Sequence, residues 1–269
     1  VKQLEEENKR LREEIELYKN IENNQRKAIQ HAGTRLFEMK EERDMLSVLF
    51  DTEDFDIKNR AVWTPNFNER LHFPVSYDGF CYTKINKVLL YNDEFSRAIV
   101  IFGTYEVMDD GEQNIIHSAA PMLSLGYFTQ RGDKWELTEF QKMFTYHGSW
   151  GEMGEVEIRQ IGKRTFALDL TSGYTNMGET SIWTNYYSIP DFRIILGITI
   201  EHSFTGREED EKAFDYETKL ITKASDKEYY DIVAETTGTK PENNQQDAEI
   251  VSANEDQTFY FNEQARVYV

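Results

Sequence analysis

Apolar residues recur at a seven-residue spacing through the first fifty positions of the chain. With Val1 taken as heptad position a, the a and d positions of the first three heptads are apolar apart from one Asn. These positions hold Val1, Leu4, Asn8, Leu11, Ile15 and Tyr18. Glu, Lys and Arg fill most of the positions between them, and a narrow apolar seam between charged flanks is typical of a coiled coil. We therefore predict a long coiled-coil helix over residues 1–50.

The residues of this seam indicate how the helix assembles. β-Branched residues at a with Leu at d favour two strands, and a single Asn8 at a favours a parallel register. The opening VKQLEEENKRLREEI resembles a leucine zipper, and a native zipper and an engineered oligomerisation tag both fit it. No basic region precedes it, as a DNA-binding zipper would need. We expect a parallel homodimer, with a trimer and a single helix docked on its own domain as alternatives.

The seam weakens after the third heptad. Glu22 and Gln25 occupy seam positions. Gly33 follows them, and Gly lowers helix stability by about 1 kcal/mol relative to Ala. The second half of the segment can therefore pack on the globular part of the chain instead of on a second copy.

An acidic run at 51–56 ends the helical pattern. Pro65 and Pro74 follow, and Pro removes a backbone donor and clashes within a helix. We therefore predict an acidic linker and irregular segment over residues 51–79.

From about residue 80 the pattern changes to short apolar or alternating runs divided by turn residues. Val, Ile, Thr, Tyr and Phe dominate these runs, as suits a pleated and half-buried strand. The predicted strands are 87–91, 97–107, 121–130, 134–139, 155–161, 165–170, 180–189, 192–201, 214–222, 229–236, 258–261 and 265–269. No long helical pattern alternates with them, which argues against an α/β fold. The sequence predicts a mainly β domain over residues 80–269.

An antiparallel β-sandwich or a barrel-like domain fits these runs best. Arg131-Gly-Asp133 is predicted as a tight hairpin, 258–268 as a closing hairpin, and the polar stretch 238–256 as a long mobile loop. An irregular propeller-like array also fits, although no repeat of fixed period is visible.

Several turn and hairpin segments resemble those of a group of bacterial proteins. The segments are Gly132–Trp135, Gly151–Gly154, Ser172–Thr180, Tyr229–Thr239 and Phe259–Tyr268. Across residues 95–269 the pattern is similar to uncharacterised exported β-rich proteins of the bacterial envelope. The resemblance implies a periplasmic or other envelope location and brings no activity; a cytoplasmic location is the alternative. Because the chain opens at Val1 without Met, we expect a preceding segment in the native protein, such as a signal or anchor.

The negative charge lies mainly in the β region. The net charge is −19, with 10 basic and 11 acidic residues in 1–50 against 20 basic and 38 acidic residues in the rest. An acidic surface repels phosphate backbones and anionic lipid headgroups, so we expect the β domain to bind neither nucleic acid nor a membrane surface. A basic protein partner fits this charge, and so does a charge that only keeps the domain soluble.

No motif has the form of a catalytic or cofactor site. The sequence lacks a Walker loop and a G-x-G-x-x-G fingerprint, and Gly148–Gly151 lacks the spacing of a nucleophile elbow. The five histidines stand at no zinc-binding spacing, and the acidic runs 109–112 and 208–211 lack the EF-hand spacing. Cys81, the only cysteine, is expected to be a buried small residue. We predict no catalytic residue, no cofactor and no metal.

One stretch, 173–187, is rich in Gly, amides and aromatic residues, as binding loops often are. A glycine turn leading into a strand with core aromatic residues explains the same composition, and we prefer that interpretation. If the domain binds a ligand, the candidate residues are Trp150, Tyr174, Asn176, Trp183 and Tyr186.

Three functions are open. The favoured one is a non-enzymatic envelope protein in which the coil dimerises and the acidic β domain binds a protein or cell-wall partner. The second is an acidic inhibitor or immunity-type protein that neutralises a basic toxin or enzyme, marked by steep salt dependence. The third is a glycan-acting hydrolase, which would need a pocket with two carboxylates of perturbed pKa.

Overall fold

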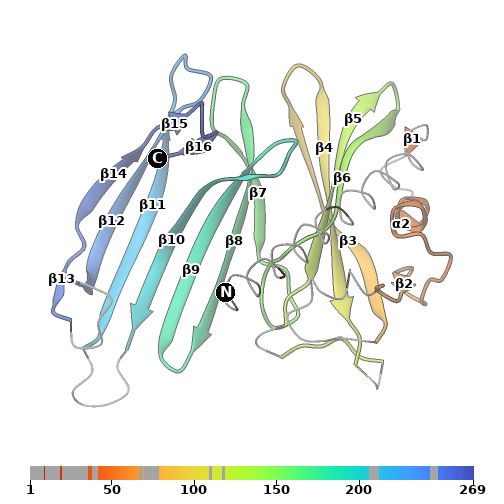
Figure 1. Ribbon diagram of the computed structural model, residues 1–269, viewed down its shortest axis with the longest axis horizontal. Coiled ribbons are helices and arrows are strands. Elements are labelled where there is room, and N and C mark those ends of the chain that lie inside the picture. The colour runs from red at the N-terminus through yellow and green to blue at the C-terminus, as the bar shows by residue number, and fades with distance from the viewer. Residues whose placement is uncertain are drawn as a thin grey trace. The chain divides into compact units, whose positions relative to one another are not determined.

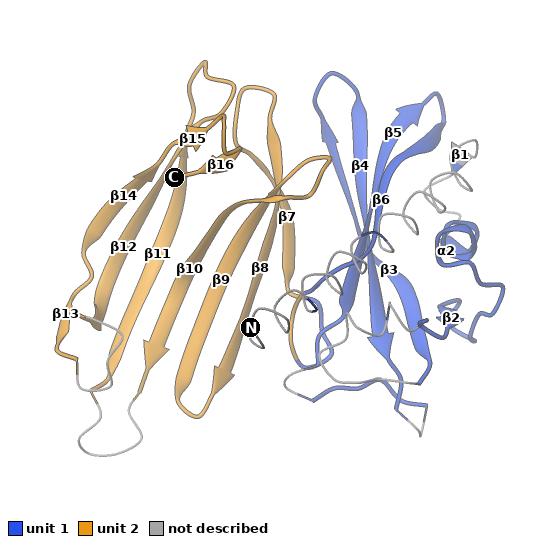
Figure 2. Ribbon diagram, in the orientation of Figure 1, with its two compact units in different colours: residues 1–146, 150–153 blue, residues 147–149, 154–269 orange. Residues whose placement is uncertain are grey.

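The chain is mainly β and divides into two compact units. The computed structural model (Figure 1) describes residues 9, 19, 36–37, 42–66, 69, 79–108, 111–116, 119–205, 212–242 and 248–269. Figure 2 distinguishes unit 1, Val1–Tyr146 with Trp150–Met153, from unit 2, His147–Ser149 with Gly154–Val269. The predicted antiparallel β class is confirmed. The β domain that we expected as one body over 80–269 is divided between the two units.

Unit 1 contains a sheet of six strands within the described residues. They are β1 (Leu36–Phe37), β2 (Ala61–Trp63), β3 (Cys81–Asn92), β4 (Ser96–Glu106), β5 (Met122–Arg131) and β6 (Lys134–Tyr146). Their order is β1-β6-β5-β4-β3-β2, and every neighbouring pair is antiparallel. The predicted hairpin at 131–133 is confirmed, because Arg131 pairs with Lys134 across it. Gly132 has a φ of 66°, the positive value that a type II′ turn takes at its first central residue.

One face of this sheet packs against helix α2 (Glu42–Phe50). The helix buries Met45, Leu46, Val48, Leu49 and Phe50. The Phe50 ring contacts the rings of Trp63, Phe102 and Phe140, with centroids between 5.6 and 5.9 Å apart. Cys81 is buried in the same core, as predicted. Burial of this aromatic cluster ties α2 to the sheet of its own unit.

The helix ends where the acidic run begins, as the sequence predicted. Asp51 adopts a left-handed φ of 53°, and the Thr52 amide donates to the Ser47 carbonyl at 3.2 Å. This is the Schellman arrangement, in which the second residue after the cap bonds back across the last turn. The following residues are more ordered than a linker: Phe55 bridges to Ala61, and Ala61–Trp63 form the edge strand β2.

The predicted helix over 1–50 is corrected in its second half. Leu36 and Phe37 form strand β1 and pair with Glu136 and Trp135 of β6. In α2 the heptad position Arg43 is exposed, whereas buried Met45, Val48 and Leu49 occupy neither a nor d. The face that packs on the sheet therefore includes the seam positions Leu46 and Phe50 but leaves out Arg43 and extends beyond the a and d positions. The seam residues Val1, Leu4, Asn8, Leu11, Ile15 and Tyr18 lie outside the described residues, so the coiled coil stays a prediction.

Unit 2 contains a second antiparallel sheet. Its described strands are β7 (Glu155–Gln160), β8 (Phe166–Asn176), β9 (Glu179–Ser188), β10 (Ile194–Phe204), β11 (Phe214–Lys223), β12 (Asp231–Pro241), β13 (Ile250–Ser252) and β14 (Glu255–Phe259). The order is β13-β12-β11-β10-β9-β8-β7, and β14 also pairs with β12. A separate hairpin joins β15 (Phe261–Asn262) to β16 (Val267–Tyr268). The loop predicted over 238–256 is wrong at both ends, because β12 runs to Pro241 and β13 and β14 pair with it.

The core of unit 2 is formed by residues of β8, β9, β10 and β12 together with the closing hairpin. Its fully buried members are Ile161, Ala167, Tyr186, Ile195, Leu196, Ile232 and Tyr268. The Tyr268 hydroxyl lies 3.0 Å from the Tyr230 carbonyl oxygen and 3.3 Å from that of Ile161. The closing hairpin therefore anchors the C-terminus in this core. Within the described residues, no helix is long and apolar enough to cross a membrane.

Candidate functional site

Aromatic side chains from four neighbouring strands gather on one face of the unit 2 sheet. In one row, Tyr174 of β8 lies opposite Ser181 of β9, and Ser181 lies opposite His202 of β10. His202 in turn lies opposite Tyr216 of β11. Side chains opposite one another in a sheet project from the same face. These strands therefore place three rings on one face, with Ser181 between Tyr174 and His202.

A second row lies one step along the same strands. It runs from Asn176 through Glu179 and Phe204 to Phe214, each opposite the next. Residues two apart in a strand share a face, so this row lies on the same face as the first. Trp183 is two residues from Ser181 on the side away from Glu179, and it lies on that face as well. We use the name aromatic face for these rings: Tyr174, Trp183, His202, Phe204, Phe214 and Tyr216.

The rings of the aromatic face support one another. His202 meets Phe214 and Tyr216 edge-on, with centroids 4.9 and 5.9 Å apart. Tyr174 and Trp183 are tilted against each other at 6.2 Å. Edge-to-face pairs are worth about 0.5–1.5 kcal/mol each beyond the burial of their area. The packing therefore holds the rings in place in the absence of a ligand.

These rings are not a closed core. Tyr174 is 43% exposed, and Trp183, His202, Phe204, Phe214 and Tyr216 are each half-buried. Half-buried aromatic rings on a sheet present part of their surface to solvent. A ligand that lies flat on the sheet could therefore cover several of them at once.

Polar groups lie among the rings. The Glu179 carboxylate accepts a hydrogen bond from His202 Nε2 at 2.9 Å. Burial raises the pKa of the Tyr174 hydroxyl, and the neighbouring Glu179 carboxylate raises it further, so this hydroxyl stays neutral and can donate. Asn176 is exposed beside them at the end of β8. The face thus offers ring surfaces together with hydrogen-bond donors and acceptors.

The candidate residues from the sequence have mixed outcomes. Tyr174 and Trp183 lie together on the aromatic face, and Asn176 lies at its edge. Tyr186 is 2% exposed and belongs to the core on the opposite side of the sheet, because it lies three residues from Trp183 in a regular strand. Tyr186 is therefore not part of the aromatic face. Trp150 is 61% exposed but belongs to unit 1.

Four members of the aromatic face escaped the sequence analysis: His202, Phe204, Phe214 and Tyr216. A signal was present, because each strand carries two rings at a spacing of two, His-Ser-Phe on β10 and Phe-Asp-Tyr on β11. That spacing predicts a shared face within each strand. Only the register between the strands shows that both pairs join Tyr174 and Trp183.

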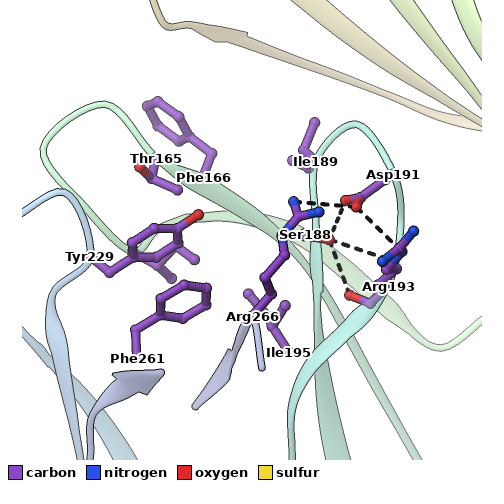
Figure 3. A pocket seen from close by; sticks show the side chains of 11 residues that line it. Thr165, Phe166, Ser188, Ile189, Asp191, Arg193, Ile195, Tyr229, Phe261 and Arg266 are labelled. Carbon is purple, nitrogen blue, oxygen red and sulfur yellow. Dashed lines mark hydrogen bonds and ion pairs between the residues drawn. The ribbon is translucent and has the colours of Figure 1, made fainter. Parts of the chain in front are cut away.

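Unit 2 also has a small pocket near the closing hairpin (Figure 3). Tyr229 and Phe261 stack in parallel on one side, with ring centroids 3.6 Å apart. On the other side Asp191 lies 3.5 Å from Arg193 Nε and 3.4 Å from Arg266 Nη2. The volume is about 40 Å³, which holds roughly three waters at about 10–15 Å³ each. Small-molecule sites are typically about 300–1,000 Å³. The charged groups here pair with each other and join the closing hairpin to the β9–β10 turn.

No set of three or more His, Cys, Asp and Glu side chains is placed to hold a metal ion within the part of the chain that the structure describes. Comparisons of the chain with protein-family models, with curated proteins and with solved structures find no match.

Proposed function

We propose that the chain is a non-enzymatic binding protein of the bacterial cell envelope, whose aromatic face binds a glycan of the cell wall. The observation that supports this is the row of Tyr174, His202 and Tyr216 across neighbouring strands, flanked by further rings. The envelope location rests on the resemblance of residues 95–269 to exported β-rich proteins. The N-terminal seam joins two copies, so that two aromatic faces act together.

The chemistry of a sugar matches such a face. A pyranose ring presents C–H groups on its flat sides, and their slightly positive hydrogens meet the negative face of an aromatic ring. Its hydroxyls lie around the rim and need donors and acceptors. Glu179, His202 and Ser181 lie between the rings and can satisfy them.

A polymer suits this site better than a single sugar. One ring contact is worth about 0.5–1.5 kcal/mol, so a monosaccharide binds weakly. The rings span four strands at about 4.8 Å per strand, which lets successive sugars of a chain contact successive rings. Two faces in one dimer add avidity on a repetitive wall without any new contact.

The direct test is co-sedimentation of the full chain with insoluble peptidoglycan that has been stripped of protein. We expect the wild-type chain to enter the pellet and soluble wall fragments to compete it off. Trp183→Ala and Tyr216→Ala should each weaken binding by roughly tenfold, because each removes a ring of the face. Circular dichroism checks that both variants keep their β signal.

Tyr260→Ala is the matched control. Tyr260 is 56% exposed in unit 2 and outside the aromatic face, and its two hydrogen bonds to Val269 are made by its backbone. Its replacement should leave binding unchanged. The proposal is wrong if the wild-type chain stays in solution, or if Trp183→Ala and Tyr216→Ala bind as well as Tyr260→Ala. Binding that salt abolishes while soluble fragments have no effect would also overturn it, because the attraction would then be ionic.

A further inference from the structure

A group of large apolar side chains stands exposed on three loop segments of unit 1, before β3, after β4 and after β6. We call it the loop patch: Phe80, Met108, Ile115, Ile116 and Trp150, which are between 49% and 64% exposed. A monomeric protein shows single exposed apolar residues routinely, whereas a contiguous group of them marks an interaction surface.

Backbone contacts place these residues side by side. The Val107 amide donates to the Phe80 carbonyl at 3.1 Å, which brings Phe80 next to Met108. The Gly151 amide donates to the Ala119 carbonyl at 2.8 Å, and the Ala119 amide donates to Ile116 at 2.8 Å. The loop after β4 and the loop carrying Trp150 therefore form one surface.

Side-chain hydrogen bonds hold the two loops together. Gln113 Nε2 donates to the Gly151 carbonyl at 2.5 Å, and the Tyr82 hydroxyl donates to the Gln113 side-chain oxygen. Asn114 Nδ2 donates to the Glu106 carboxylate at 3.0 Å. The apolar residues are thus exposed on a fixed framework, which lowers the entropy cost of binding a partner.

The loops approach each other closely at Gly151. Its φ is 72°, and a Cβ there would lie 2.5 Å from Gln113 Nε2 and 3.1 Å from Ile115 Cγ2. Both the positive φ and these close contacts require glycine at position 151.

The surroundings of the loop patch are acidic. The described residues of these loops, 102–108, 111–116, 119–120 and 150–153, contain three acidic residues and no Lys or Arg. Glu112 and Glu152 are exposed beside the apolar side chains, and Glu106 is half-buried. Glu152 directly follows Gly151, whose backbone bonds to Gln113 and Ala119, so Glu152 lies next to this framework. Arg60 stacks on Tyr82 at 3.6 Å, but its charge is paired with Asp56.

We propose that the loop patch is a docking surface for a basic amphipathic segment of a partner protein. Apolar side chains of that segment pack on Trp150, Ile115 and Phe80, and its Lys or Arg residues pair with Glu112 and Glu152. The complementary charge decides the class of partner, because the same carboxylates repel an acidic segment or an anionic lipid surface. This site is independent of glycan binding, since all its residues belong to unit 1.

The test selects peptides from a random library displayed on phage, using the immobilised full chain. We expect the enriched peptides to combine Lys or Arg with aromatic or aliphatic residues. A synthetic copy of one should bind the chain with an affinity that falls as salt is raised. Trp150→Ser should weaken it by roughly tenfold or more, as loss of an interface aromatic does, and Glu112→Lys with Glu152→Lys should do the same.

Leu90→Ser is the matched control, because Leu90 is 66% exposed in unit 1 and lies on β3 outside the loop patch. It should leave peptide binding unchanged. The proposal is overturned if the selected peptides lack positive charge, if none is enriched, or if they bind Trp150→Ser as tightly as wild type. It is also overturned if Trp150→Ser changes the solution mass of the chain, since the patch would then bind a second copy. Trp150-dependent binding to vesicles of zwitterionic lipid would assign it to a membrane instead.

Discussion

Tyr216 of β11 lies directly opposite Gly238 of β12, and no side chain could replace that glycine without moving the backbone. Gly238 has a φ of 119°, and a Cβ there would lie 2.2 Å from the Asp215 carbonyl oxygen and 2.8 Å from the Tyr216 Cα. The aromatic row therefore ends at a position without a side chain. The strand geometry and the aromatic face depend on the same glycine.

Gly238→Ala should lower the free energy of unfolding of unit 2 by about 1–3 kcal/mol, because it adds a strained φ and a clash with backbone atoms. Urea unfolding followed by circular dichroism measures the change. Gly132→Ala is the control: Gly132 also has a positive φ, but nothing lies within 4 Å of its Cβ position. Its cost should be smaller, since it carries the strain without the clash. Equal losses in the two variants would show that the contact with Asp215 has no effect.

His147 should make the chain less stable as the pH falls below neutrality. Its ring is 4% exposed, and Nε2 donates to the Glu155 carbonyl at 2.9 Å. Burial lowers the pKa of this ring below its usual value near 6.5, although the Glu155 carbonyl and Asp169 oppose the shift. The unfolded chain therefore binds a proton more readily than the folded chain in the window below about pH 6.5. Stability from this group is present above that pH and is lost as the pH falls toward the lowered pKa.

Two measurements check this prediction. An NMR titration should find one of the five histidines with a pKa below the usual value, and its signal should be missing in His147→Gln. Denaturant unfolding at a series of pH values should show a smaller loss of stability below pH 6.5 in His147→Gln than in the wild type. A normal pKa for His147 would mean that solvent reaches its ring.

The Cys81 thiol should be unreactive in the folded chain. Cys81 is fully buried in the core of unit 1, beside the residues of α2. A thiol reagent must reach the sulfur atom, and full burial of Cys81 denies it access. A chromogenic disulfide reagent should release no signal from the native chain and one equivalent in denaturant. Rapid labelling of the native chain would show that the α2 cover opens readily.

The strands were largely readable from the sequence, because each needs only a local pattern. Alternating apolar residues and turn residues predicted a run that overlaps each of β3–β12, and Gly132 marked its hairpin. Strands β1 and β13 were missed, and the predicted run 258–261 overlaps only the end of β14. Strand β13 has only three residues and pairs with the end of β12. Strand β1 has two residues and forms by pairing with β6, which lies far away in the sequence. Pairing with a distant strand overrides local propensity there.

The candidate site shows the same division. Aromatic richness around 173–187 pointed to Tyr174 and Trp183, but it could not separate Trp183 from Tyr186 without the phase of the strand. A three-residue step in a regular strand places the two on opposite faces, Trp183 half-buried on the aromatic face and Tyr186 in the core. His202 and Tyr216 required the register between strands, which no single run of sequence contains.

The predicted homodimer through the N-terminal seam must be tested with the full chain, because α2 belongs to the core of unit 1. A variant that lacks residues 1–50 would lose Met45 and Phe50, both buried in the core of unit 1. Unit 1 would then unfold, and the mass of the variant would not report on the coiled coil alone. Leu4→Glu combined with Leu11→Glu instead places carboxylates at two seam positions while leaving residues 36–50 intact. Light scattering after size exclusion should give about twice the 31.7 kDa chain mass for wild type and the single chain mass for this variant.

Lys9→Glu is the control for the added charge, because Lys9 is helical and exposed and stands at heptad position b. It should keep the mass of the wild-type chain. Asn8→Ile tests the register: an apolar residue in place of the single seam Asn should strengthen association and allow larger oligomers beside the dimer. A wild-type chain that elutes at its single-chain mass would contradict the zipper and leave the aromatic face to act as one copy. Its binding to an insoluble wall should then lack avidity, and soluble fragments should displace it at concentrations close to their own dissociation constant.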